Sequence, residues 1–165
     1  MKTVAVGYFA AAHQTRNDRI RKEDSRMSAA LYQIGIDIGG THFRIGAVSP
    51  DGEVYGHKII SSRTFLALQT PVEALISEVR SFIKETKGKP EGIVIGFPGT
   101  VGRDQATVLS CPNLPVFDGV NIRAAFEAAL GLPTNVEHEV LLLLTNDLRH
   151  YDLEEKDCVM ALYLG

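Results

Sequence analysis

Apolar and polar positions alternate with a period of two through residues 33–38, which is typical of a β-strand. Residues 43–48 and 53–60 are interpreted as a second and a third strand. Short turn sequences separate these segments: Gly39-Gly40 lies between the first two, and Pro50-Asp51-Gly52 lies between the last two. Both are compatible with tight turns. Three consecutive strands joined by tight turns predict an antiparallel meander.

From residue 70 onward the period changes to that of a helix. Apolar side chains recur three and four positions apart and predict one buried helical face over residues 70–87. These side chains are Val72, Leu75, Ile76, Val79, Phe82 and Ile83. Thr70 occupies the expected N-cap, Pro71 the first helical position and Glu73 the position that completes a capping box. Gly88 is expected to end the helix.

The remainder of the chain alternates between strands and helices. Ile93-Val94-Ile95 is a short apolar run, as expected for a strand buried on both faces. A helix follows Asp118 and ends at Gly131-Leu132-Pro133. The pattern then predicts a strand at 134–137, a helix at 140–148 and a last strand at 158–164. The order is βββαβαβαβ, an α/β fold whose mixed sheet carries helices on its faces.

Composition narrows the class of protein. The 165 residues are 45% hydrophobic and 22% charged, which suits one packed domain and excludes general disorder. No apolar run approaches the roughly 20 residues of a membrane-spanning helix, so we expect no membrane partner. The formal net charge of −3 argues against nucleic acid binding through bulk electrostatics. Cys111 and Cys158 lack metal-ligand spacing and are expected to be reduced, buried thiols of a cytoplasmic protein.

The charge balance changes near residue 33. Residues 1–33 carry 6 Lys and Arg against 3 Asp and Glu, whereas residues 34–165 carry 11 against 17. We therefore predict an N-terminal extension over 1–33, disordered or helical, and a folded domain over 34–165. Four interpretations of the extension stay open: a secretory leader, a basic arm for nucleic acid, a solvated segment of mixed charge, and a translation start at Met27.

The segment from Asp37 to Thr41, Asp-Ile-Gly-Gly-Thr, carries the strongest chemical signal. Gly39 and Gly40 allow a tight turn whose N–H groups can hold phosphate oxygens, and the Thr41 hydroxyl adds a donor. Asp37 would repel phosphate directly, so its expected role is to hold Mg²⁺ beside the phosphate. Arg44, on the next strand, would add positive charge. The alternative is an ordinary hairpin turn with a capping aspartate.

The run GIDIGGTHFRIGAVSPDGEV, at residues 35–54, resembles the first phosphate motif of the ROK family of sugar kinases and related repressors. Residues 92–99 resemble the family's strand and Pro-Gly loop at the sugar site, and residues 110–115 resemble its PNL segment. The resemblance implies an actin-like, ribonuclease H-like ATPase fold for residues 34–165. Within the family, GFP with Val101 and Asp104, SCPNLP and the late YLG are most similar to bacterial D-allose kinases.

The resemblance implies a kinase that uses ATP and Mg²⁺ and phosphorylates a hexose. Pro98, Gly99 and Asn113 are then expected to bind the sugar. Pro98 and Gly99 place a rigid turn at the end of a buried strand, where α/β folds commonly bind ligands. Asn113 offers the donor and acceptor that sugar hydroxyls require. Turn formation also explains each of these residues taken alone.

The expected catalytic position departs from the family pattern. The family usually has Asn-Asp after the short strand, and that Asp accepts the proton of the attacking sugar hydroxyl. Here His138 replaces Asn and Glu139 replaces Asp. Glu139 keeps a carboxylate base of similar intrinsic pKa, about 4.3 against 3.9. Its extra methylene displaces the base, however, and a shift near 1 Å can cost about 10²-fold. His138 would bind the sugar or accept the proton itself.

Three functions therefore stay open. By resemblance the family's kinases are substantially longer, with a second lobe that carries the adenine contacts. We expect this chain to be the N-terminal lobe alone, to transfer phosphate very slowly or not at all, and to self-associate through the apolar face left by the missing lobe. The alternatives are a vestigial domain without ligand and the sugar-sensing domain of a ROK repressor, for which residues 1–33 are too short to form a winged helix.

Overall fold

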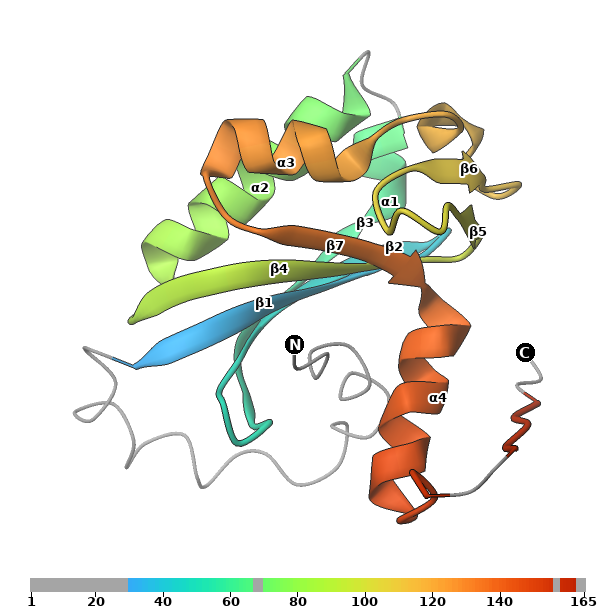
Figure 1. Cartoon of the computed structure of the whole chain (residues 1–165). Coiled ribbons are helices and arrows are strands. Elements are labelled where there is room, and N and C mark those ends of the chain that lie inside the picture. Colours follow the sequence, from blue (N-terminus) through green and yellow to red (C-terminus); the bar gives the residue numbers. More distant parts are fainter. Residues whose placement is uncertain (1–29, 67–69, 156–157, 163–165) are drawn as a thin grey trace.

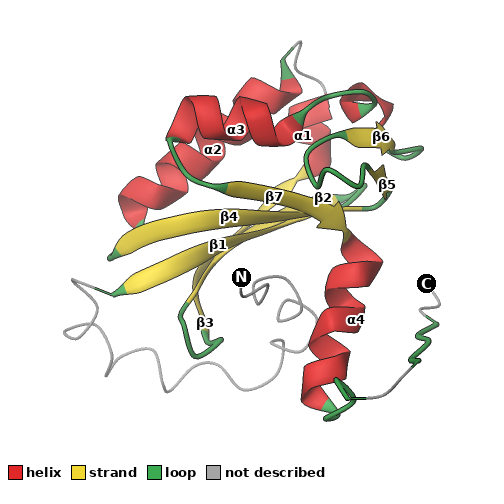
Figure 2. Cartoon of the chain, viewed as in Figure 1, coloured by secondary structure: helices red, strands yellow, loops and turns green. Residues whose placement is uncertain are grey.

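The computed structural model describes residues 30–66, 70–155 and 158–162. Its strands are β1 (Leu31–Ile38), β2 (His42–Val48), β3 (Val54–Ser61), β4 (Lys89–Phe97), β5 (Thr100–Val101), β6 (Val108–Ser110) and β7 (Thr134–His138). Its helices are α1 (Ser62–Leu66), α2 (Pro71–Glu85), the 3₁₀ turn η2 (Pro115–Phe117), α3 (Ile122–Leu130) and α4 (Glu139–His150). Figures 1 and 2 show these elements arranged around one central sheet.

The central sheet has five strands in the order β3-β2-β1-β4-β7. β1, β2 and β3 pair antiparallel, whereas β4 runs parallel to β1 and β7 runs parallel to β4. This confirms the predicted meander and the mixed sheet. A small hairpin of β5 and β6 stands beside the ends of β4 and β7 (Figure 1).

The main core lies between one face of the sheet and the helices α2 and α3 (Figure 1). The period-two pattern of β1 places its isoleucines on this face, and the helical period of α2 turns its apolar stripe toward them. The fully buried members include Ile34, Ile36, Ile38, Phe43, Ile45, Leu75, Val79, Ile95, Phe97, Phe117, Ile122 and Phe126. Phe97 and Phe117 meet edge to face, with ring centroids 5.3 Å apart.

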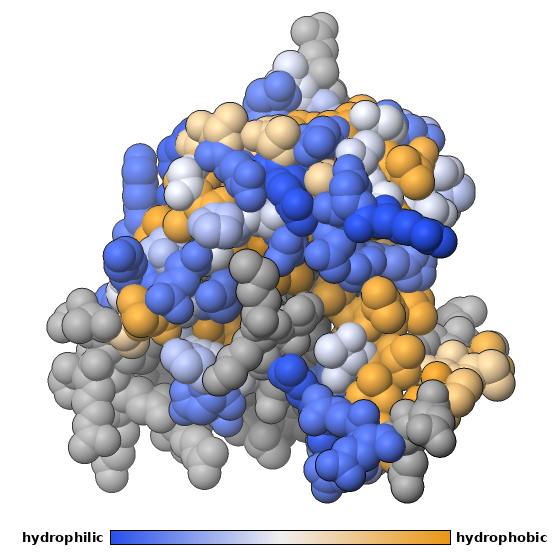
Figure 3. Space-filling model, in the orientation of Figure 1, coloured by the Kyte–Doolittle hydropathy of each residue, from blue (hydrophilic) through white to orange (hydrophobic). Residues whose placement is uncertain are grey.

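The opposite face of the sheet carries α4. Leu142 of α4 packs against Val48 and Val94 on that face. Most of the remaining α4 leucines stay partly exposed, and Leu141 is 47% exposed. In Figure 3 the upper part of this helix, at the lower right of the molecule, is apolar, whereas its lower end is hydrophilic. No helix in the described part of the chain is long and apolar enough to cross a bilayer.

The folded domain begins earlier than the charge pattern predicts. β1 starts at Leu31, and Tyr32 is buried in the core. Three residues that we assigned to the N-terminal extension, 31–33, therefore belong to the sheet. The reason is that β4 begins at Lys89, so Lys89 and Pro90 supply parallel partners for Leu31 and Tyr32. Residues 1–29 of the predicted extension lie outside the described residues.

Three further expectations are wrong. The last strand does not form over residues 158–162, where Met160 and Leu162 are 91% and 80% exposed, because no described strand pairs with this segment; residues 163–164 lie outside the described residues. Cys158 is exposed rather than buried for the same reason. The Thr70 side chain makes no capping hydrogen bond to α2, so the capping box does not form, although Pro71 does occupy the first turn.

Candidate functional site

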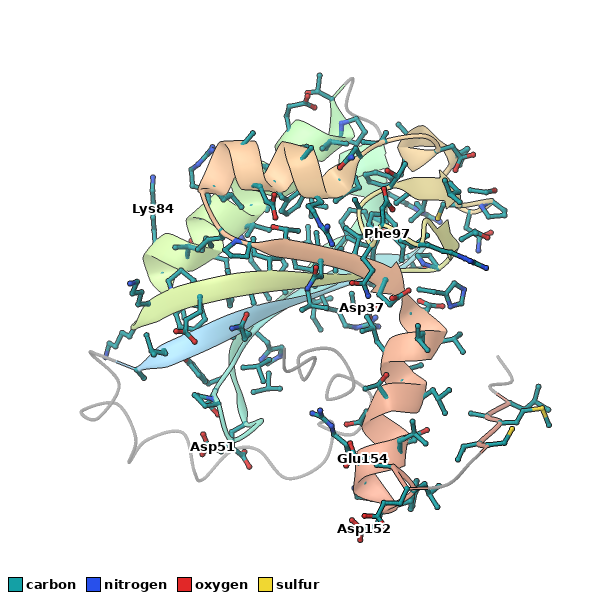
Figure 4. The ribbon with its side chains drawn as sticks, in the orientation of Figure 1. Asp37, Asp51, Lys84, Phe97, Asp152 and Glu154 are labelled. Atoms are coloured by element: carbon teal, nitrogen blue, oxygen red, sulfur yellow. The ribbon has the colours of Figure 1, made fainter. Side chains whose placement is uncertain are left out.

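The carboxyl ends of β1, β4 and β7 meet at one edge of the sheet. In register, Asp37 of β1 lies beside Gly96 of β4, and Gly96 lies beside Glu137 of β7. Figure 4 labels Asp37 and Phe97 at this edge, where β7 passes into α4. Open α/β sheets bind ligands at the carboxyl ends of their strands. The segments that follow these ends are the glycine turn 39–41, the loop 98–99 and the start of α4.

Asp37 forms an ion pair with Arg44, its direct cross-strand partner on β2. The Arg44 Nη1 donates to Asp37 Oδ2 at 2.8 Å. Arg44 lies on the next strand, as expected, and its side chain contacts Asp37. The other carboxylate oxygen, Oδ1, has no hydrogen-bond partner among the described residues. Asp37 keeps one oxygen with which it can bind a second cation.

The glycine turn has fewer phosphate donors than its sequence predicts. The Gly39 N–H donates to the His42 carbonyl at 3.0 Å, so it is not available to a ligand. A Cβ at Gly39 would lie 2.9 Å from that same oxygen, whereas a Cβ at Gly40 would contact only the Asn113 Cβ, at an ordinary 3.8 Å. Packing therefore requires glycine at 39 but not at 40. The donors left to phosphate are the Gly40 N–H and the Thr41 N–H and hydroxyl.

Ser62, the first residue of α1, contacts the glycine turn and was missed by sequence reasoning. Its side-chain hydroxyl donates to the Gly39 carbonyl at 2.6 Å, and its backbone N–H donates to the Thr41 carbonyl at 2.9 Å. Ser62 has 0% exposure. A serine after a strand resembles an ordinary loop residue, so its sequence carries no signal of this contact.

Pro98 and Gly99 hold two loops together. A Cβ at Gly99 would fall 2.3 Å from the Ser110 carbonyl oxygen, so this packing requires glycine. The buried thiol of Cys111 donates to the Pro98 carbonyl at 3.7 Å. Pro98 and Gly99 therefore shape the edge of the site through packing. Proline and glycine carry no polar side chain with which to bind a sugar.

Asn113 is brought to the glycine turn by these loops. Its Cβ is the only atom that a Cβ at Gly40 would approach, and the residue is exposed. The PNL segment and the glycine turn are thus neighbours, although 72 positions separate Asn113 from Thr41 in the sequence. Asn113 can therefore contact a ligand that has the group to be phosphorylated beside Gly40.

His138 and Glu139 form the junction of β7 and α4. The His138 Nδ1 accepts a hydrogen bond from the Val140 N–H at 3.2 Å and caps α4. A ring nitrogen that accepts carries no proton, so the neutral ring carries its proton on Nε2. His138 can therefore donate to a ligand through Nε2. The expectation that His138 itself accepts the substrate proton does not fit this arrangement.

Glu139 is half-buried at the first position of α4. Burial raises the pKa of its carboxyl, and the negative charge of Asp37 raises it further, while His138 lowers it. Asp37 and Glu139 lie at the carboxyl ends of β1 and β7, which are at the same edge of the sheet. A partly buried carboxyl of raised pKa beside a second acid is typical of a general base.

Glu137 is a second residue that sequence reasoning missed. Its Oε1 accepts from the His138 backbone N–H at 2.9 Å, and its Oε2 accepts from the Gln105 Nε2 at 3.0 Å. Gln105, in the turn between β5 and β6, also accepts from the Val136 N–H through its carbonyl at 2.9 Å. The hairpin is thereby fixed to the last residues of β7, immediately before the two site residues.

Comparison with known proteins identifies the family. The ROK family profile matches residues 33–160. The chain belongs to the ROK family. This ROK chain is 31% identical over 145 residues to a glucokinase of Thermotoga maritima and 29% identical over 134 residues to an N-acetyl-D-glucosamine kinase of Vibrio vulnificus. These matches cover 82% and 79% of this chain but only 42% of each relative. The chain therefore spans less than half the length of these relatives.

Solved structures support the same assignment. A ROK family glucokinase from Streptomyces griseus, determined with glucose and AMPPNP, is 28% identical, with a TM-score of 0.57 over 65% of this chain and 33% of that chain. The ROK chain described here has the actin-like ATPase fold that the resemblance implied. A ROK family transcriptional regulator shares the fold at 20% identity, with a TM-score of 0.56 over 72% of this chain and 33% of that chain.

Proposed function

We propose that this ROK chain is the hexose-binding and phosphate-binding lobe of an ATP-dependent sugar kinase, with Glu139 as the general base. The observation that carries the proposal is the half-buried Glu139 carboxyl, whose pKa is raised by burial and by Asp37. A base that accepts a hydroxyl proton must be positioned beside the phosphate site, and the carboxyl ends of β1 and β7 bring these two acids to one edge.

The proposed roles follow the arrangement of the side chains. Glu139 accepts the proton of the attacking hydroxyl. His138, through Nε2, and Asn113, through its amide, bind the sugar, while Pro98 and Gly99 hold the loop that positions Asn113. The Gly40 and Thr41 donors bind the phosphate of ATP. Because positioning dominates phosphoryl transfer, the rigid cap that His138 makes on α4 helps fix Glu139 at the hydroxyl.

Asp37 fits a magnesium ion. Its Oδ1 is a hard oxygen ligand without a partner among the described residues, and Mg²⁺ is commonly held by one or two carboxylates, water and substrate phosphates. The described residues contain no group of three or more His, Cys, Asp and Glu side chains that could hold a metal ion by themselves, which agrees with an ion shared with the nucleotide. When bound, the ion neutralises charge on the transferring phosphate. Arg44 keeps Asp37 oriented toward this position.

The sugar is proposed only as a hexose, with D-allose as the first member to test because of the SCPNLP segment at residues 110–115. The related kinases differ in their named substrates: one is a glucokinase and another an N-acetyl-D-glucosamine kinase. We further propose that a second lobe completes the nucleotide site, that the α4 face contributes to self-association or to that lobe, and that the reaction takes place in the cytoplasm, where ATP is available. Nucleic acid is not part of the proposal.

Titrations of the ¹⁵N-labelled chain, followed by NMR, test the proposal because they detect millimolar affinities. We expect hexoses to shift the Asn113 side-chain amide and Mg-ATP to shift the Gly40 and Thr41 amides. Glu139→Gln should leave Mg-ATP binding unchanged and abolish any residual phosphate transfer. Glu91→Gln, at an exposed glutamate near the start of β4, is the matched control.

Three results would count against the kinase. Absence of shifts with both ligands favours the vestigial domain. Hexose binding without nucleotide binding favours the sugar-sensing domain of a repressor, whose fold this chain shares. Phosphate transfer that survives Glu139→Gln removes Glu139 from the mechanism.

A further inference from the structure

Ser62 contacts the glycine turn on both sides of Gly40. Its hydroxyl donates to the Gly39 carbonyl at 2.6 Å and its N–H donates to the Thr41 carbonyl at 2.9 Å. With tyrosine and cysteine counted as apolar, Ser62 and Thr134 are the buried polar residues in the described part of the chain. A fully buried hydroxyl costs free energy unless it is hydrogen-bonded, and the turn is what Ser62 bonds to.

The direction of these bonds determines where the turn's donors point. A trans peptide is planar, and its C=O and N–H point in opposite directions. Because the Gly39 carbonyl points toward the buried Ser62, the Gly40 N–H of the same peptide points away from Ser62. The Gly40 N–H has no acceptor among the described residues, and Gly40 itself is exposed. Ser62 thus orients the Gly40 amide, one of the donors that are left for phosphate.

A second connection links Ser62 to the sheet. Ser61, the last residue of β3, pairs with His42 at the start of β2, and His42 in turn accepts from the Gly39 N–H. Ser62 therefore extends the β2–β3 ladder by one bond beyond its last pair and adds a side-chain bond to the opposite end of the turn. The glycine turn is held from β3 as well as from its own strands.

We propose that Ser62 is a positioning residue for nucleotide phosphate, which holds the Gly39 and Thr41 carbonyls so that the Gly40 amide faces the ligand. This inference rests on the proposed function, because it concerns the phosphate site of that kinase. Ser62 does not contact the phosphate and acts only through the turn. A hydroxyl at 62 is required for this role, whereas a side chain of the same size without a strong donor is not sufficient.

The test measures nucleotide and hexose affinity separately in Ser62→Ala, with Mg-ATP and D-allose or D-glucose as probes. We expect Ser62→Ala to weaken Mg-ATP binding about tenfold, a free-energy change of about 1.4 kcal/mol, and to leave hexose affinity within about twofold. Ser81→Ala is the matched control, because Ser81 also donates a side-chain hydrogen bond, to Glu85 at 2.8 Å, on the exposed surface of α2. That variant should change neither affinity.

Two further variants keep the test decisive. Ser62→Thr retains the hydroxyl and should bind Mg-ATP within about threefold of wild type, whereas Ser62→Cys retains the shape with a weak donor and should bind about as poorly as Ser62→Ala. If Ser62→Ala does not fold, the Mg-ATP affinities of Ser62→Thr and Ser62→Cys are compared instead. Equal Mg-ATP affinity of these two, or equal loss of nucleotide and hexose affinity in Ser62→Ala, overturns the positioning role. Failure of the wild-type chain to bind Mg-ATP overturns the proposed function instead.

Discussion

Gly40→Ala tests whether ligand binding requires glycine at position 40, because packing does not require it there. A Cβ at Gly40 would contact only the Asn113 Cβ at 3.8 Å, and Gly40 lies outside the left-handed region of φ. Gly40→Ala should therefore leave the free energy of unfolding unchanged, or raise it by about 0.4–1 kcal/mol because the unfolded chain loses conformational freedom. If phosphate approaches the Gly40 N–H at hydrogen-bond distance, about 2.9 Å, the added methyl group obstructs it. We expect the Mg-ATP dissociation constant to rise at least tenfold, about 1.4 kcal/mol.

Gly99→Ala is the matched comparison. There the new Cβ would fall 2.3 Å from the Ser110 carbonyl oxygen and 2.9 Å from the Cys111 Cα, and both are backbone atoms that cannot rotate away. Overpacking of this kind costs about 1–3 kcal/mol or more, and each kcal/mol lowers the melting temperature of a domain of this size by about 4 °C. Gly99→Ala should therefore lower the melting temperature by at least about 4 °C, whereas Gly40→Ala should not lower it.

Urea unfolding followed by circular dichroism measures the stability of both variants, and NMR titration with Mg-ATP measures binding. The reasoning predicts opposite patterns: stable but deficient in nucleotide binding for Gly40→Ala, and destabilised for Gly99→Ala. Wild-type Mg-ATP affinity in a folded Gly40→Ala protein would refute the assignment of the Gly40 amide to phosphate. Destabilisation of Gly40→Ala by more than about 1 kcal/mol would show instead that the turn itself requires glycine at this position.

Three further predictions concern pKa, burial and capping. Because the folded-state pKa of Glu139 is raised, its protonated carboxyl favours the fold at low pH, and this contribution is lost as pH rises through that pKa. Glu139→Gln should therefore have a higher melting temperature than wild type near about pH 8 and lose this advantage near about pH 4. A difference in melting temperature that stays the same across this pH range would contradict the prediction. Tyr32→Phe removes a buried hydroxyl with no partner in the described structure. Urea unfolding should therefore show a free energy of unfolding that is unchanged or raised by up to about 1 kcal/mol. A loss of more than about 1 kcal/mol would show that the hydroxyl has a partner. Asn121→Ala removes the acceptor of the 2.8 Å hydrogen bond from the Ala124 N–H that caps α3, and should lower the free energy of unfolding by about 0.5–2 kcal/mol. Thr70→Ala, where no capping bond forms, should lower it by less than about 0.5 kcal/mol. Equal losses for the two substitutions would show that the observed cap contributes little.

The fold could be predicted where an element is long enough to show a period. The meander, α2 and α3 each bury one clear apolar face, and the turn at Gly131 ends α3 in the left-handed conformation that glycine favours. The β5–β6 hairpin was missed because strands of two and three residues show no alternation. The last predicted strand failed for the opposite reason: an apolar run forms a strand only where a neighbour pairs with it, and residues 158–162 have none in the described structure.

The candidate site could also be predicted only in part from the sequence. Side chains that follow strand ends, such as Asp37 and Glu139, could be predicted to share an edge because parallel strands bring their carboxyl ends together. The contact of Asp37 with Arg44 follows from counting register outward from the two-glycine turn, although we expected Arg44 only to add positive charge. Ser62 and Glu137 could not be predicted, because both act on backbone groups of other segments. A sequence shows which side chain is present but not which distant backbone carbonyl or N–H it meets.

The number of donors at the glycine turn limits how tightly this chain can bind nucleotide alone. With the Gly39 N–H bonded to His42, two amides and the Thr41 hydroxyl remain. Hydrogen bonds to a charged group contribute about 1.5–3 kcal/mol each, and association costs at least about 4 kcal/mol. The difference is at most about 5 kcal/mol, which corresponds to a dissociation constant no tighter than a few tenths of a millimolar. A dissociation constant well below that value in the isolated chain would therefore require nucleotide contacts outside the turn. The exposed side of the site next to α4 is where these contacts should be sought.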